Sequence, residues 1–103
     1  MNESLTVERV WSVLATILDP EFGLNIVDLG LIYDVTLADD EVRVAMTLTS
    51  PGCPAGEMIH GGVQRALEEM PGVGTVCVDL VWEPAWTPAM LTAAAREHLG
   101  WTE

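Results

Sequence analysis

Cys53 is the residue in this sequence best placed for reactive chemistry. It stands in the run Ser50-Pro51-Gly52-Cys53-Pro54, ahead of a helical pattern, and Pro54 suits the first position of that helix. A sulfur at a helix start lies beside free backbone N–H groups and the positive end of the helix dipole, which lower the pKa of a thiol. The resulting thiolate binds iron or attacks an electrophile. The same residues are equally compatible with a small, half-buried thiol that fills a turn, because reactivity also requires exposure.

The other sulfur and nitrogen ligands are weaker candidates. Cys77 sits in the middle of a predicted strand, and free cysteines usually behave as small hydrophobic residues, so we assign it no chemical role. His60 follows Cys53 by seven residues, but one Cys and one His do not complete a structural zinc site, which takes four protein ligands. We therefore expect a surface histidine. The two cysteines are not spaced as C-x-x-C, which excludes a thioredoxin-type redox pair.

Four carboxylates occur in apolar or proline-bounded loops, away from the runs of ordinary surface charge: Asp19, Glu21, Asp28 and Glu83. Any two of them would make an acid/base pair or hard metal ligands if they converged. The sequence alone does not show that they converge.

The charge balance excludes some partners. The 103 residues include sixteen Asp and Glu against four Arg and no Lys, with a formal net charge of −12. Such a surface repels phosphate backbones and anionic lipid heads, so we expect neither nucleic acid nor membrane partners. No secretory signal pattern and no apolar run of about 20 residues is present. We therefore expect a cytoplasmic protein with reduced cysteines.

Periodicity predicts the first half of the chain. An apolar stripe favours a helix capped by Thr6 and ending near Leu18, because Pro20 disfavours helical backbone at the residue before it. Residues 19–30 form a loop that packs against the body. Residues 31–37 and 42–48 alternate with period two and are joined by a polar turn, which indicates an antiparallel hairpin.

The second half adds a helix, a strand and a helix. The helix after Pro54 ends at Pro71-Gly72, and its interior Gly61 and Gly62 indicate close approach of another backbone. A strand over residues 75–82 follows, parallel to its neighbour by a right-handed crossover. Thr87 caps a last helix that ends at Gly100. With half of its residues hydrophobic, the chain forms one domain over residues 1–103. The fold class is α/β, a two-layer α-β-β-α-β-α domain with a mixed three-stranded sheet and helices mainly on one face.

Three long motifs resemble the SufT/PaaD-type metal–sulfur (iron–sulfur) cluster assembly domain family. Residues 19–35 are similar to its opening signature, residues 46–54 to its cysteine loop, and residues 81–91 to its closing signature. The order is the family's own, and the motifs span most of the chain.

The resemblance implies a role in maturing iron–sulfur proteins, as an assembly or transfer factor rather than a metabolic enzyme. It places the reactive cysteine and metal ligand at Cys53. The pocket residues that it implies are Asp19, Glu21, Thr49 and Ser50, with Asp28 and Glu83 as supports. The implied cofactor is a transient iron–sulfur cluster, and the implied partners are iron–sulfur assembly proteins and client apoproteins.

The number of ligands shapes the predicted mechanism. One thiolate cannot hold a cluster that normally takes four. Either a homodimer bridges the cluster through Cys53 of each chain, or Cys53 takes part in a transient handover to a client. Two alternatives stay open: a metal-free adaptor that recruits assembly factors or clients, and a thiol-dependent enzyme. A Cys-x5-Arg phosphatase loop would need an arginine where Ile59 stands.

Overall fold

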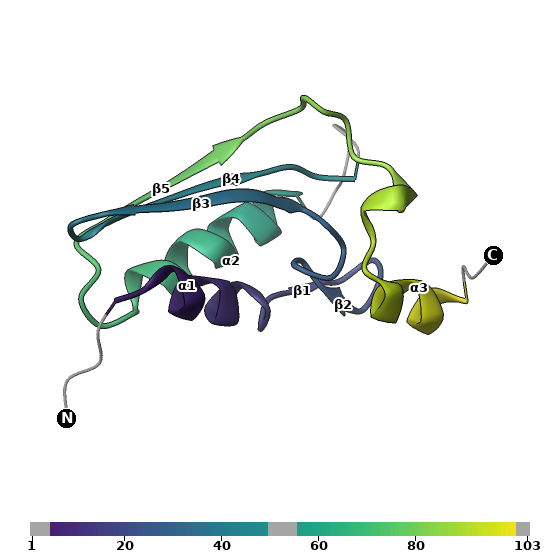
Figure 1. Cartoon of the computed structure of the whole chain (residues 1–103), viewed down its shortest axis with the longest axis horizontal. Helices are drawn as coiled ribbons and strands as arrows, with labels where there is room; N and C mark the ends of the chain where they lie inside the picture. Colours follow the sequence, from purple (N-terminus) through teal and green to yellow (C-terminus); the bar gives the residue numbers. More distant parts are fainter. Residues whose placement is uncertain (1–4, 50–55, 101–103) are drawn as a thin grey trace.

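The computed structural model describes residues 5–49 and 56–100 of the chain (Figure 1). The first helix precedes the main sheet, the second connects its last two strands, and the third follows the last strand. In chain order the elements are α1 (Val7–Leu14), β1 (Leu18–Asp19), β2 (Leu24–Asn25), β3 (Ile32–Ala38), β4 (Glu41–Met46), α2 (Gly56–Glu68), β5 (Thr75–Leu80), the 3-10 helix η1 (Pro88–Met90) and α3 (Ala93–Leu99).

The main sheet has the strand order β3-β4-β5 and is mixed, as predicted. β3 and β4 form an antiparallel hairpin, whereas β5 runs parallel to β4 after the α2 crossover. Figure 1 shows α1 and α2 on the same side of this sheet, with its other face open. The predicted two-layer α/β fold is therefore confirmed.

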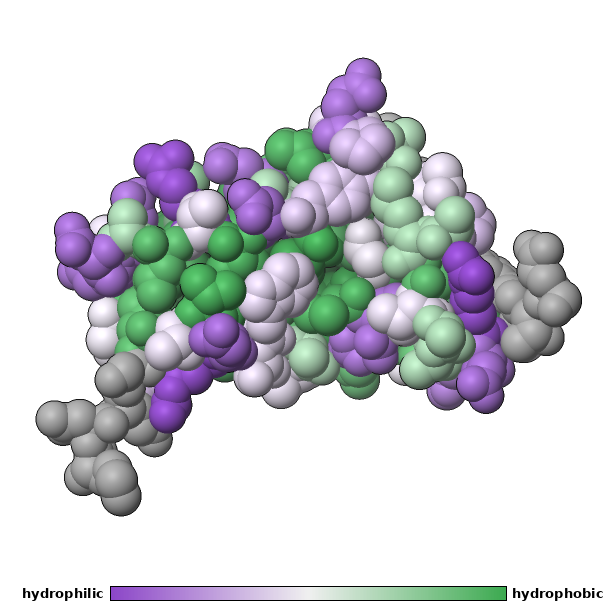
Figure 2. All heavy atoms as spheres, viewed as in Figure 1, coloured by the Kyte–Doolittle hydropathy of each residue, from purple (hydrophilic) through white to green (hydrophobic). Residues whose placement is uncertain are grey.

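The core lies between the sheet and the two helices. Its central side chains are fully buried and come from both layers: Val10 and Leu14 of α1, Val42 and Val44 of β4, and Val63 and Leu67 of α2. Figure 2 shows apolar residues between the sheet and the helices and mostly hydrophilic residues along the outer rim. No helix within residues 5–49 and 56–100 has the length and apolar content needed to cross a bilayer.

The first helix is shorter than predicted. The Thr6 side chain accepts a hydrogen bond from Arg9 N, which confirms the N-cap, but α1 ends at Leu14 rather than near Leu18. Thr16 Oγ1 donates to Val13 O over 2.6 Å, and such local bonding competes with the helical ladder. Leu18 and Asp19 then pair with Leu24 and Asn25, so the predicted loop contains a small antiparallel hairpin.

The close backbone approach predicted at the glycines of α2 is not found within the described chain. A Cβ built at Gly61 or Gly62 meets no heavy atom of the described chain within 4 Å, so no backbone within it approaches either residue. Each glycine still costs a helix interior about 1 kcal/mol relative to alanine.

The last helix is also divided differently from the prediction. Thr87 leads only into the short η1, and Leu91 is extended, with φ −66° and ψ 143°. α3 begins after Thr92, whose side chain accepts a hydrogen bond from Ala95 N over 3.2 Å. The predicted end at Gly100 is confirmed, since this glycine adopts φ +74° at the C-cap.

Candidate functional site

The three sequence motifs meet at the end of the sheet where β4 and β5 finish. Val81 N donates to Met46 O over 2.8 Å, which ties the closing motif to the start of the cysteine motif. Thr47 N donates to Leu31 O, also over 2.8 Å, which ties the cysteine motif to the opening motif. Segments far apart in the sequence are thus joined by direct backbone hydrogen bonds.

Two aromatic side chains fasten the closing motif to the opening motif. The Trp86 indole Nε1 donates to Leu29 O over 2.6 Å, and Tyr33 OH donates to Pro84 O over 2.7 Å. The sequence reasoning gave neither side chain this role. The available signal was the polar group of each aromatic side chain, Trp86 in a loop and Tyr33 in a strand, because a partly buried indole N–H or phenol needs a hydrogen-bond partner.

Gly30 allows the same two segments to approach closely. It adopts φ +78°, and a Cβ at this position would overlap the Met90 backbone. Thr92 N also donates to Asp28 O over 3.0 Å. The segment from residue 84 to residue 92 is therefore held against the opening motif at several points.

Asp19 is the most unusual carboxylate among the described residues. Its side chain is only 1% exposed, and its Oδ1 accepts a hydrogen bond from Glu21 N over 2.8 Å. Its Oδ2 is buried without a hydrogen-bond partner in the described structure. Burial raises the pKa of Asp19 above its ordinary value, because desolvation disfavours the charged form. A buried carboxylate oxygen without a partner is available to a ligand.

Asp28 has a structural role. Its Oδ2 accepts from Asn25 Nδ2 over 2.9 Å, and its backbone N–H donates to Asn25 Oδ1 over 2.8 Å. This reciprocal pair closes the turn after β2. Sequence reasoning missed Asn25, although an Asn three residues before an Asp is a common capping arrangement.

The remaining predicted site residues differ in exposure. Glu21 and Glu83 are exposed, whereas Thr49 is half-buried just after β4. Of the six pairs among Asp19, Glu21, Asp28 and Glu83, only Asp19 and Glu21 are joined by a hydrogen bond that the described structure contains. Cys53 and Ser50 lie outside the described residues, so their predicted roles stay predictions.

A hollow of about 500 Å³ opens beside the start of α2. Leu48, Leu80 and Trp82 form its apolar walls, and the remaining lining residues come from the first turns of α2: Gly56, Glu57, His60 and Gly61. His60 is half-buried and not simply a surface residue. Its Nε2 lies 3.1 Å from Val78 O and donates to this carbonyl when the Nε2 carries the proton. The lining of the hollow thus includes residues that come before and after residues 50–55 in the sequence, the segment that contains Cys53.

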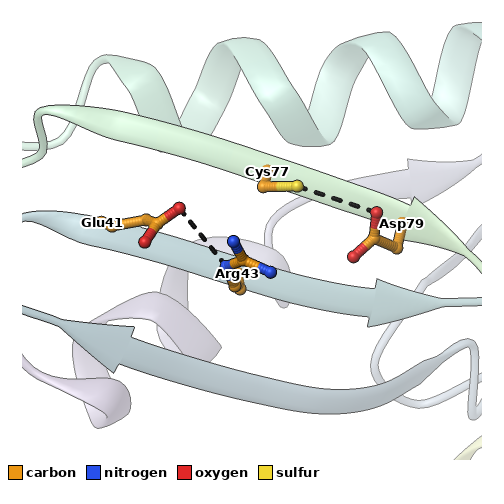
Figure 3. A network of polar contacts seen from close by, with 4 residues as sticks. All are labelled: Glu41, Arg43, Cys77 and Asp79. Atoms are coloured by element: carbon orange, nitrogen blue, oxygen red, sulfur yellow. Dashed lines mark hydrogen bonds and ion pairs between the residues drawn. The ribbon is translucent and has the colours of Figure 1, made fainter.

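Cys77 lies on the open face of the sheet, apart from the meeting point of the motifs. Figure 3 shows it beside Asp79 on β5, with Glu41 and Arg43 on β4 projecting from the same face. Its Sγ lies 3.7 Å from Asp79 Oδ1. Arg43 is paired instead with Glu41, at 3.3 Å. Cys77 thus lies in a polar cluster at the surface of the sheet and is half-buried, rather than packed as a hydrophobic residue.

The described residues do not form a metal-binding centre by themselves. Within residues 5–49 and 56–100, no three side chains of His, Cys, Asp or Glu are grouped to hold a metal ion. A cluster held as cargo would therefore need ligands from residues 50–55, from a second chain or from exogenous thiols.

Comparison with known proteins gives a consistent family. The model of the family described as "Iron-sulfur cluster assembly protein" matches residues 7–78. The chain is 45% identical over 101 residues to an Fe-S protein maturation auxiliary factor from Porphyromonas gingivalis, covering 96% of each chain. It is 45% identical over 85 residues to the Fe-S protein maturation auxiliary factor SufT from Staphylococcus aureus, covering 82% of this chain and 97% of that protein.

A solved structure agrees with the fold. A conserved hypothetical protein from Thermotoga maritima is 39% identical and superposes with a TM-score of 0.84, covering 97% of this chain and 99% of that one. The sequence motifs, the fold and these likenesses together show that the chain belongs to the iron–sulfur cluster assembly protein family, as the resemblance predicted.

Proposed function

We propose that this protein is an auxiliary factor in the maturation of iron–sulfur proteins and that the thiol of Cys53 is its working group. The observation that carries the proposal is the meeting of three family motifs at one end of the sheet. The opening motif also contains a buried carboxylate oxygen of Asp19 without a partner in the described structure. The names of two relatives that cover most of the chain support the same role.

In this proposal, the cluster is cargo and Cys53 supplies one ligand. An iron–sulfur cluster normally takes four protein ligands. A single thiolate leaves coordination positions for exogenous thiols, for a second copy of the chain or for the cysteines of a client. Incomplete ligation favours release, which is what a transfer factor requires.

Asp19 has a supporting role in this proposal. Its backbone is fixed by pairing of β1 with β2, and its Oδ1 is already engaged by Glu21 N. The free Oδ2 offers a hydrogen-bond acceptor when the carboxyl is ionised and a donor when it is protonated. Glu21, Thr49, Ser50 and Glu83 complete the set of residues that we assign to this site, with Asp28 holding the adjacent turn.

Anaerobic reconstitution with iron and sulfide tests the assignment. We expect cluster absorbance in the wild type and its loss in Cys53→Ala. Cys77→Ala is the matched control, since this thiol lies on the open sheet face, and it should reconstitute like the wild type. Equal cluster absorbance in the wild type and Cys53→Ala would overturn the assignment of Cys53 as a cluster ligand.

The metal-free adaptor is the main alternative. It predicts that Cys53→Ala still supports maturation of a client in a defined assay. A thiol enzyme is the other alternative, and it predicts rapid single-turnover oxidation of Cys53 by peroxide. The two measurements separate these alternatives from cluster transfer.

A further inference from the structure

β5 is an edge strand with little protection. Within residues 5–49 and 56–100 it pairs with β4 only, in an unbroken parallel register from Glu41 opposite Thr75 to Met46 opposite Leu80. Residues 75–80 contain no proline and no lysine, and the register has no bulge, so three of the devices that block an edge are missing from this strand. Asp79 is its one charged side chain.

The backbone of β5 offers hydrogen bonds along this edge. Val81 N donates to Met46 O, so the odd-numbered residues of this stretch bond toward β4. In a parallel ladder the alternate residues, here Val76, Val78 and Leu80, direct their N–H and C=O groups outward. The outward carbonyl of Val78 already has a side-chain partner, His60 Nε2 at 3.1 Å, so an added strand would bond to the Val76 and Leu80 groups and to the Val78 N–H.

The hollow defined above lies at the end of the same edge. Its apolar walls include Leu80 and Trp82, which are 39% and 42% exposed. These two are half of the large hydrophobic side chains that are strongly exposed in the described residues, the others being Leu18 and Met58. An apolar hollow of about 500 Å³ is within the size range of specific binding pockets.

Gly61 keeps this hollow open. It lines the hollow, and a Cβ at this position meets nothing within 4 Å in the described chain. Glycine destabilises a helix interior relative to alanine, and packing within the described chain gives no reason for its presence. A partner that packs against the start of α2 would explain why a glycine is present at this position.

The negative charge of the molecule favours a positively charged partner. Glu57 lines the hollow, Asp79 projects from β5, and the whole chain carries −12 with no lysine. A second copy would bring the same negative charge to this edge, which disfavours it. A segment rich in lysine or arginine is attracted instead.

We propose that an extended, basic segment of a partner protein adds as a fourth strand along β5 and places a large apolar side chain in the hollow. Strand addition of this type draws affinity from main-chain hydrogen bonds and specificity from pockets for alternate side chains. The proposal deepens the proposed function, because it rests on that function for the partner being an assembly factor or a client.

A synthetic peptide tests this surface. The probe is a labelled heptapeptide, Lys-Val-Lys-Phe-Lys-Val-Lys, in which the lysines occupy one face of a strand and the apolar residues the other. Fluorescence anisotropy with the full chain should show binding, which should be lost when every lysine is replaced by glutamate. Hydrogen exchange should slow at the outward amides of Val76, Val78 and Leu80 when the peptide binds.

Two glycine variants give a matched comparison. Gly61→Met fills the hollow and should weaken peptide binding about tenfold or more, the scale of a lost apolar anchor. Gly62→Met places the same side chain at the neighbouring helical glycine, which also has open space but does not line the hollow, and binding should stay within about twofold of the wild type.

Absence of peptide binding, equal binding by both glycine variants, or unchanged exchange at the β5 amides would overturn the proposal. Cys53→Ala should bind the peptide as the wild type does. Retained cluster binding in Cys53→Ala, with normal peptide binding, would overturn the proposed function alone. Absence of peptide binding by the wild type, with cluster binding lost in Cys53→Ala as expected, would overturn the strand-addition proposal alone.

Discussion

The carboxyl group of Asp19 lies in an environment that disfavours its charged form. It is buried, one of its oxygens has no partner in the described structure, and its pKa is raised by desolvation. A group whose pKa is higher in the folded than in the unfolded chain binds more protons when folded in the pH range between the two values. Stability is therefore lost as pH rises from the unfolded pKa, about 3.9, to the raised pKa of the folded protein.

Asp19→Asn should relieve this cost. The amide oxygen still accepts from Glu21 N, and a neutral amide costs less to bury than a carboxylate. We expect the variant to gain stability relative to the wild type as pH rises from 4 to 8, because the buried carboxyl becomes charged as pH rises and the amide does not. Urea unfolding from pH 4 to pH 8 measures this, and a difference that does not change with pH would contradict it.

The same variant separates stability from function. If Asp19 belongs to the proposed site, Asp19→Asn should lower client maturation while it raises stability, as is common for groups retained at functional sites. A more stable variant with unchanged maturation would assign Asp19 a structural role only.

At the scale of elements, the attachment of residues 84–92 to the opening motif decides the shape of the site. Gly30 is required there for two reasons, its positive φ and the closeness of the Met90 backbone. Gly23 shares a positive φ, +69°, but has open space around it. Substitutions at Gly23 and Gly30 therefore separate the energetic cost of backbone strain from the cost of steric overlap.

Gly23→Ala should cost about 1 kcal/mol of stability, the scale of left-handed backbone for a residue with a Cβ. Gly30→Ala should cost about 3 kcal/mol or more, because overlap with Met90 adds to that strain. Chemical unfolding of the two variants checks this, and equal losses would show that the close approach has no energetic weight.

The N-cap of the last helix gives a second comparison at this scale. Thr92→Ala should cost about 1 kcal/mol, the usual value of a lost capping hydrogen bond. Thr87→Ala should cost less, because the Thr87 side chain makes no capping hydrogen bond. A larger loss for Thr87→Ala in urea unfolding would instead favour the single long helix predicted from sequence.

These elements show how far the sequence predicts the structure. The sheet, the crossover and the Thr6 cap follow from period-two and helical patterns, which are local signals. The end of α1 and the start of α3 do not follow, because tertiary hydrogen bonds decide them: Leu18 and Asp19 pair with β2, and Thr92 N bonds to Asp28 O. Periodicity carries no information about such long-range partners.

At the scale of the whole molecule, the sequence located the motifs and the structure brought them together. The burial of Asp19 and the hollow beside α2 depend on packing between distant segments, so the sequence alone did not reveal them. The pairing of Asp28 with Asn25 is local, and its sequence signal was missed. Cys53 was predicted from its helix-start position and from the family resemblance, and it lies outside the described residues.

The acidic surface belongs to this scale as well. A net charge of −12 steers association with basic partners, and salt screens such attraction. Binding of a client or assembly factor should therefore weaken as ionic strength rises from about 0.05 M to 0.5 M, mainly through a slower association rate. Stopped-flow or surface-based kinetics over a salt series measures this, and rates independent of salt would contradict it.

Client maturation in a defined anaerobic assay tests the central claim most directly. Wild type, Cys53→Ala and Cys77→Ala are compared for the rate at which an iron–sulfur apoprotein becomes active when cluster, thiol and the factor are supplied. The account predicts faster maturation with the wild type and Cys77→Ala and no acceleration with Cys53→Ala. Full acceleration by a folded Cys53→Ala protein would contradict the assignment of Cys53 as the working group.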